Sequence, residues 1–173
     1  MLKKFNKKTW ILAVTSLLFL FTLPAALAQA PAPSSPEVCP PINAQIVAAL
    51  FDRWNASLAT NNPDKVVANY ASDAVLLPTL SNTPRTNRKQ MRAYFVDFLK
   101  KHPIGHIDQR TVRFGCDWAT DTGLYTFTLT SHGKKTDVEA RYSYVYEYIA
   151  GQWLIVQHHS SLMPEGKVED TAL

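Results

Sequence analysis

Residues 139–161 read EARYSYVYEYIAGQWLIVQHHSS, and this stretch decides the fold. Tyrosine occupies every second position from Tyr142 to Tyr148, which is the period of a β-strand with one apolar face. Gly151 then marks a turn into a second segment that is rich in β-branched and aromatic residues. The stretch therefore predicts two antiparallel strands joined by a short hairpin loop.

The two-residue period also extends toward the N-terminus. From His106 to Trp118 apolar and polar residues alternate, a turn is expected at residues 119–121, and the alternation then resumes as far as Leu129. A further turn at Gly133 leads into the tyrosine-rich segment. Four consecutive strands with short connections predict an antiparallel meander.

Helical segments precede the meander. Apolar residues recur every three to four positions from Ile42 onward, Pro63 opens a short second helix, and a third begins near Asn87 and ends before Pro103. A brief apolar strand at residues 74–78 separates the second helix from the third. The chain therefore predicts an α+β fold, with three N-terminal helices packed on a strongly curved antiparallel sheet.

The first 28 residues have the pattern of a secretory signal peptide. Four lysines precede an uncharged apolar run, and small residues favour cleavage before Gln29. The alternative is an uncleaved anchor, but the run is shorter than the roughly 20 residues of a spanning helix. We therefore expect an exported protein, periplasmic or extracellular, without a stable membrane anchor after cleavage. The expected segments are a signal peptide (1–28), a Pro/Ala/Ser-rich linker (29–41), one compact domain (42–164) and a flexible tail (165–173).

Loss of this signal peptide changes the charge of the chain. The full sequence has 18 Lys and Arg against 14 Asp and Glu, and four of the lysines lie in residues 1–28, so 14 of each sign remain. A chain with zero net charge and no clustered basic run lacks the features of a nucleic-acid-binding domain. We therefore expect no nucleic-acid partner.

Cys39 in the linker and Cys116 in a predicted strand are the two cysteines of the chain. In an exported protein an even count favours a disulfide between them, and two separate thiols are the alternative. Two cysteines are too few for a structural zinc site, and no cofactor-binding motif is present. We expect neither a metal nor a cofactor.

Two segments resemble a known family. Gly151, Trp153, Val156, His159 and Ser161, in GQWLIVQHHSSLMPE, resemble the last strand of the association domain of calcium/calmodulin-dependent protein kinase type two. The stretch LFDRWNASLATNNPDKVVANYASDAVLLP resembles the opening helices and first strand of that domain, which belongs to the nuclear transport factor two-like (SnoaL-like) superfamily. The resemblance covers residues 42–164. It implies a cone-shaped fold with an open cavity and self-association into a dimer or larger homo-oligomer.

The resemblance also suggests residues for a ligand site. It places His159 in the cavity, on the same strand face as Trp153, as a donor to an anionic ligand; a hydrogen-bonded core histidine is the alternative. Arg141 would either bind a carboxylate in the cavity or face the surface or a subunit interface. Tyr94, Tyr125 and Trp54 lie on apolar faces, where core packing is the default and cavity lining the alternative.

Two functions follow from this pattern. The first is an exported, self-associating domain whose cavity binds a small acidic or amphipathic molecule without catalysis. The alternative is a SnoaL-like enzyme, an isomerase, cyclase, hydrolase or oxidoreductase, that uses His159 as acid and base. A carboxylate within hydrogen-bond reach of His159 inside a closed pocket would favour the enzyme. A cavity with an arginine and aromatic side chains but without such a pair would favour binding.

Overall fold

The structure is a computed structural model that describes residues 38–164. The predicted signal peptide, the predicted tail and most of the predicted linker lie outside the described residues. A five-stranded sheet with the order β1-β5-β4-β3-β2 forms the framework of the described part. Its strands are β1 (Tyr70–Leu77), β2 (Ile104–Phe114), β3 (Trp118–Ser131), β4 (Lys134–Ile149) and β5 (Gln152–Leu162).

The predicted α+β class and the four-stranded meander are confirmed. The prediction of a wholly antiparallel sheet is wrong for β1, which pairs in parallel with β5 at the edge of the meander. Alternation of apolar residues identifies a strand but not its neighbour, so the direction of β1 was not readable from its sequence.

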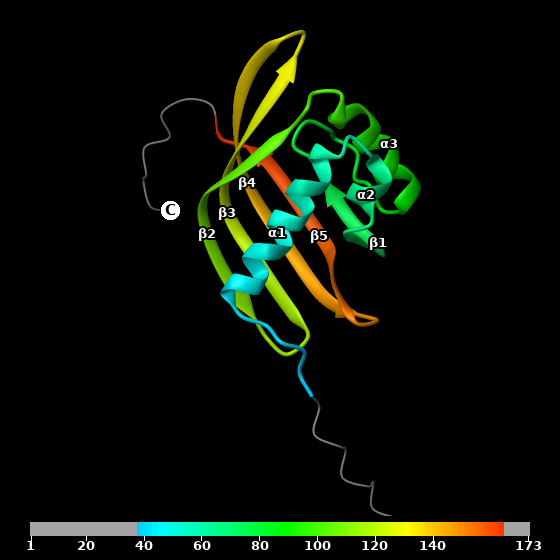
Figure 1. Ribbon diagram of the computed structural model, residues 1–173, viewed down its shortest axis with the longest axis vertical. Coiled ribbons are helices and arrows are strands. Elements are labelled where there is room, and N and C mark those ends of the chain that lie inside the picture. Colours follow the sequence, from blue (N-terminus) through cyan, green and yellow to red (C-terminus); the bar gives the residue numbers. More distant parts are fainter. Residues whose placement is uncertain (1–37, 165–173) are drawn as a thin grey trace, which may run out of the picture. The chain divides into compact units, whose positions relative to one another are not determined.

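Three helices cover one face of this sheet. They are α1 (Ala44–Ala59), α2 (Pro63–Val67) and α3 (Arg88–Leu99). Asn43, Asn62 and Asn87 cap them, each accepting a hydrogen bond from a backbone N–H of the first turn. Figure 1 shows α1 running diagonally across the sheet, with α2 and α3 beside β1.

The hairpin turns are set by local backbone conformation. His132 and Gly133 both have positive φ, as do Ala150 and Gly151, which is the type I′ geometry that matches strand twist. The predicted turn at residues 119–121 is wrong: that segment belongs to β3, and the β2–β3 loop is residues 115–117. Cys116 therefore lies in a loop and not in a strand.

Two β-bulges shift the register within the antiparallel meander, besides a shift between Tyr70 and Val75 where β1 pairs with β5. In β2 the extra residue is Asp108, because Ile107 and Gln109 pair with the adjacent residues Tyr125 and Leu124 of β3. Next to this bulge, Gly123 has φ +159, and a Cβ there would lie 1.9 Å from the carbonyl oxygen of Gln109. A residue without a side chain is therefore required at position 123.

The second bulge lies in β5. Val145 of β4 pairs with Gln157, but the next residue, Tyr146, pairs with Ile155, so Val156 has no partner in the ladder. The extra residue reverses the alternation of β5 beyond it. Trp153 and Ile155 face the helices before the bulge, whereas even-numbered residues face them after it.

The core lies between α1 and the tyrosines of β4. Tyr142, Tyr144 and Tyr146 are buried on the helix-covered face. The rings of Phe51 and Trp54 on α1 lie 6.1 and 5.7 Å from the ring of Tyr144. These aromatic contacts bury a large apolar area and fix α1 across the sheet.

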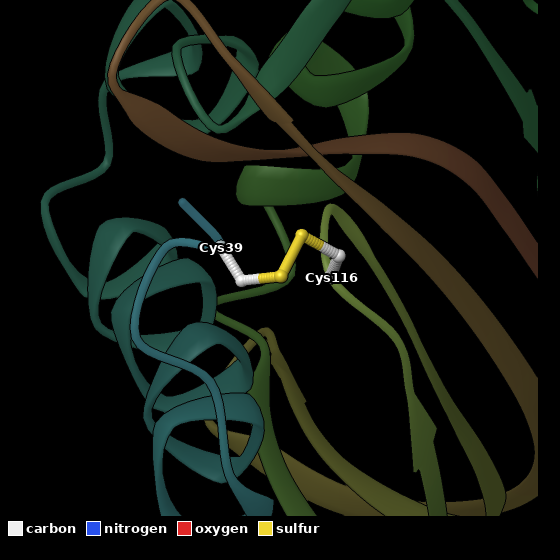
Figure 2. The surroundings of a disulfide bond; sticks show 2 residues. All are labelled: Cys39 and Cys116. Atoms are coloured by element: carbon white, nitrogen blue, oxygen red, sulfur yellow. A yellow bond between two sulfur atoms is a disulfide. The ribbon is translucent and has the colours of Figure 1, made fainter. Parts of the chain in front are cut away.

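A disulfide joins Cys39 to Cys116, which confirms the predicted pairing. Figure 2 shows that it connects the segment preceding α1 to the loop between β2 and β3. The bond spans 77 residues of sequence. It therefore anchors the N-terminal arm to the meander.

Candidate functional site: an aromatic cavity

A cavity of about 420 Å³ lies between α3, the loop after β1 and the helix-covered face of the sheet. This volume is within the range of small-molecule sites. Its deep end is formed by buried residues and its outer end by solvent-exposed ones. The deep residues are Trp54, Leu76, Phe95, Tyr125, Phe127, Ala140, His158 and Ser160, and the exposed ones include Leu80, Gln90, Ala93, Asp97 and Lys101.

Aromatic rings form much of the cavity wall. The rings of Tyr94 and Phe98 are stacked with centroids 5.7 Å apart, and Phe98 meets Phe127 edge to face. Tyr94, Tyr125 and Trp54, which the sequence offered as candidates, all line this cavity. A wall of this kind favours a ligand with a planar or apolar body.

His159 does not enter the cavity. It is exposed and pairs with Ser143 on the helix-free face of the sheet, so the prediction of its orientation is wrong. The bulge at Val156 is the reason, because the parity count from Trp153 is valid only along an unbroken ladder. His158 lies on the inner face instead and lines the cavity.

Aromatic side chains and one hydrogen bond hold His158 in place. Its Nδ1 lies 2.8 Å from the hydroxyl of Tyr70, and its ring stacks on Tyr144 with centroids 4.1 Å apart. Burial lowers the pKa of His158 to about 3, with a smaller contribution from His159, so the ring is neutral at physiological pH. The Nε2 atom is buried and has no hydrogen-bond partner among the described residues.

Arg141 lies outside the cavity as well. It is exposed, and its Nη2 donates over 3.5 Å to the carbonyl of Leu162. Its partner in β5 is Ser161, on the same face as His159. Of the two alternatives for Arg141, a position in the cavity is excluded, and the side chain lies on the outer surface of the sheet.

Arg85 is the arginine that reaches the cavity, and sequence analysis missed it. Its backbone forms an isolated β-bridge with Leu76, with N···O distances of 2.9 and 2.8 Å. This bridge fixes the loop after β1 and brings the side chain to the cavity wall. Nη2 donates to Ser81 over 3.1 Å, whereas Nε is buried and has no partner in the described part of the chain. The polar segment TLSNTPRTN predicted only a loop, so no pattern in it indicated this position.

Hydroxyl groups form a short chain at the deep end. Tyr125 donates to Ser160 Oγ over 2.5 Å, and Ser160 also contacts the hydroxyl of Thr79. Burial raises the pKa of Tyr125, so its proton is retained. These groups satisfy one another, so within residues 38–164 the lining side chains that keep an unpaired buried nitrogen are His158 and Arg85.

The α3 region concentrates positive charge beside the cavity. Residues 85–102 contain six Lys and Arg and one acid, Asp97. Asp97 is paired with Lys100 at 2.7 Å, and its side chain is 78% exposed. Arg92 is likewise paired with Asp64, so Arg85 and Lys101 are the basic side chains that line the cavity, and their charge attracts anions.

A second polar cluster lies away from the cavity. Arg110 Nε is 3.1 Å from Asp121 Oδ2, and the hydroxyl of Tyr142 donates to Asp121 Oδ1 over 2.7 Å. Burial raises the pKa of Asp121, and the contacts with Tyr142 and Arg110 oppose this shift. None of the three lines the cavity. They join β2, β3 and β4 beneath α1 and have a structural role.

Within residues 38–164, no group of three or more His, Cys, Asp or Glu side chains is arranged to hold a metal ion. The helices of the same part include none that is both long and apolar enough to span a membrane.

Helices on one face of this mixed sheet, with a cavity between them, have the architecture of the nuclear transport factor two-like fold. Residues 43–164 match the family described as the calcium/calmodulin dependent protein kinase II association domain. The chain belongs to this family.

Solved structures agree with this assignment. A putative association domain of the same family from Xanthomonas campestris is 58% identical, with a TM-score of 0.71, over 73% of this chain and 91% of that one. The CamKII hub homology domain from Chlamydamonas reinhardtii is 20% identical, with a TM-score of 0.60, over 70% and 98% of the two chains. A putative aromatic ring hydroxylase from Novosphingobium aromaticivorans is 18% identical, with a TM-score of 0.61, over 68% and 87%. The last two show the fold alone. The comparison with curated proteins found no match.

Proposed function

We propose that this chain is an exported, self-associating domain whose cavity binds a small acidic or amphipathic molecule. The observation that carries the binding function is Arg85. Arg85 lines an aromatic cavity, and its buried Nε–H has no acceptor among residues 38–164. A carboxylate supplies both the missing acceptor and the opposite charge.

The surroundings of Arg85 support an acid as the ligand. Lys101 also lines the cavity, and the region from Arg85 through α3 has an excess of positive charge. Asp97 is the one acidic lining residue, and its carboxylate is already paired with Lys100. An anion entering from the outer end therefore meets attraction and little repulsion.

The arrangement of His158 favours binding over catalysis. An acid–base histidine is normally oriented by a carboxylate, but the Nδ1 of His158 contacts the hydroxyl of Tyr70. His159, the acid and base of the alternative function, faces away from the cavity. A cavity with an arginine and aromatic walls but without a histidine–carboxylate pair fits a binding site.

The binding function is tested by recovering the native ligand. The full chain is expressed in a bacterium, purified without added ligands, and the cavity contents are identified by denaturing mass spectrometry beside an Arg85→Gln control. We expect a small acid in the wild type and its loss from the variant. Recovery of a neutral or cationic molecule in equal amounts from both proteins would contradict the proposal.

Self-association is proposed from the family and from the outer face of the sheet. Val145, Leu154 and Val156 are half-buried on the face that no helix covers, and Trp118 beside them is 41% exposed. A second copy of the chain would remove this apolar surface from water. The zero net charge that remains without residues 1–28 adds little repulsion between copies.

Light scattering at tens of micromolar chain tests this part. We expect a mass of two or more chains, and a shift toward the monomer in Val145→Lys. Ala56→Lys adds the same charge on the exposed side of α1 and leaves the mass unchanged. A monomeric wild type would refute self-association without affecting the ligand proposal.

A further inference from the structure

Two side chains at different depths of the cavity each have one buried nitrogen that is unpaired among the described residues. Arg85 is half-buried and is joined by Lys101 toward the exposed end, whereas His158 is 4% exposed and lies among buried aromatic rings. One anion at Arg85 leaves His158 unsatisfied. The deeper group therefore requires an explanation of its own.

The hydrogen bonds around Tyr70 determine which nitrogen of His158 carries the proton. Trp54 Nε1, which can only donate, lies 3.0 Å from the Tyr70 oxygen. If Tyr70 in turn donates to Nδ1 of His158, then Nε2–H is the one polar group left unpaired among the side chains of Trp54, Tyr70 and His158. If Nδ1 carried the proton instead, both the Tyr70 proton and the Nε2 lone pair would be buried without partners. The first arrangement leaves fewer unpaired groups, so Nε2 is a donor.

A donor in this position has no structural role that the described residues reveal. Stacking on Tyr144 and the bond to Tyr70 already hold the ring. An unpaired buried N–H carries a desolvation cost, which an acceptor on a bound molecule removes. The lowered pKa of His158 agrees with a ring that stays neutral in this environment.

We propose that the ligand carries, besides its acidic group, a second and uncharged acceptor that receives a hydrogen bond from Nε2–H of His158. This inference rests on the proposed function and specifies its ligand class: an aromatic or compact apolar acid with a carbonyl or ether oxygen at the far end. The deep acceptor is uncharged because burial of an anion beside a neutral imidazole is unfavourable. The ligand is thus bound at two points, by Arg85 at its acidic group and by His158 at its uncharged acceptor, and its apolar body lies between the aromatic walls.

Matched pairs of acids test the inference. The probes are 4-acetylbenzoate, 3-acetylbenzoate and 3-benzoylpropanoate, each compared by calorimetry with the analogue in which the carbonyl is replaced by a hydrocarbon group of similar shape. We expect at least one oxo acid to bind the wild type about tenfold tighter than its analogue, the effect of one buried hydrogen bond. Equal affinities within every pair would overturn the inference while leaving the proposed acid site intact.

A neutral probe separates the two proposals. The methyl ester of 4-acetylbenzoate keeps the deep acceptor but lacks the anion. If the ester binds as tightly as the acid, the proposed function fails and the deep site stands. If none of these acids or the ester binds, both proposals are refuted for this ligand class.

The tautomer of His158 can be measured directly in the wild-type protein. In ¹⁵N-labelled protein, the His158 signals are expected to show a neutral ring with the proton on Nε2, and the oxo acid should shift Nε2 while its analogue does not. A proton on Nδ1 would overturn the inference directly. His158→Phe keeps an aromatic ring and should abolish the difference within each pair, whereas His159→Phe on the outer face should preserve it. If His158→Phe folds poorly, the ¹⁵N measurement on the wild type decides.

Discussion

Nδ1 of His158 in β5 and the hydroxyl of Tyr70 in β1 form a hydrogen bond of 2.8 Å across 88 residues of sequence. The bond links the two parallel strands at the edge of the sheet and lies beside the cavity. It fixes the orientation of the imidazole, and burial of the same ring ties the stability of the fold to pH.

Stability should fall when the solution is acidified. The pKa of His158 is about 3 in the folded protein and near 6.5 in the unfolded chain, so the unfolded state binds more protons between these values. The contribution is complete above pH 6.5 and is lost as the pH falls toward 3. At pH 5 the free energy of unfolding should be about 2 kcal/mol lower than at pH 7.5 from this group.

Denaturant titrations at the two pH values measure this difference. His158→Phe should remove most of it, since no titrating group remains at that position. His159→Phe, on the exposed face, should retain it. An unchanged pH dependence in His158→Phe would show that another group is responsible.

Loss of the cavity guanidinium should weaken binding of an acid. Arg85→Gln keeps a polar side chain but removes the charge, and we expect the affinity for 4-acetylbenzoate to fall by about 1.5–3 kcal/mol, the range for hydrogen bonds to charged groups. Arg141→Gln is the matched control, because Arg141 lies on the outer face. Calorimetry on the three proteins decides, and an equal loss in both variants would point to a general charge effect.

Position 123 should not tolerate a side chain. A Cβ would lie 1.9 Å from the backbone oxygen of Gln109, so Gly123→Ala must displace one of two paired strands. We expect a loss of about 3 kcal/mol or more in the free energy of unfolding, as for other severe backbone conflicts. Gly133→Ala is the control: its φ is +76 but nothing lies within 4 Å, so strain alone should cost about 1 kcal/mol. Similar losses in both variants would contradict the bulge argument.

The disulfide should stabilise the domain without influencing the ligand site. For a bond closing 77 residues, the chain-entropy relation gives up to about 4.5 kcal/mol. The double variant Cys39→Ser, Cys116→Ser should therefore unfold at lower denaturant, and a reducing agent should lower only the wild-type midpoint. Neither cysteine lines the cavity, so affinity for a bound acid should not change. A parallel loss of affinity would show that the N-terminal arm supports the cavity.

Much of the secondary structure was readable from local pattern. Asn43, Asn62 and Asn87 cap helices whose apolar spacing is plain in the sequence, and the tyrosines from Tyr142 to Tyr146 share a buried face as their alternation indicates. The turn between β2 and β3 was misplaced, because several polar residues near Cys116 satisfy the same turn preferences. The family resemblance was likewise correct, since it rests on residues of two sequence segments and on the order of elements.

The sequence by itself determined the class of fold, the meander and the pairing of two cysteines, because periodicity, turn residues and cysteine count act locally or along the chain. Only the tertiary structure decided which residues meet in the cavity. The bulge at Val156 arises where β5 pairs with β4, and it turns His158 inward and His159 outward against the parity of the sequence. Arg85 reaches the cavity through a backbone bridge to Leu76, nine residues away. Both placements depend on which strand lies beside which, and strand register is fixed by packing of the whole sheet rather than by any one segment.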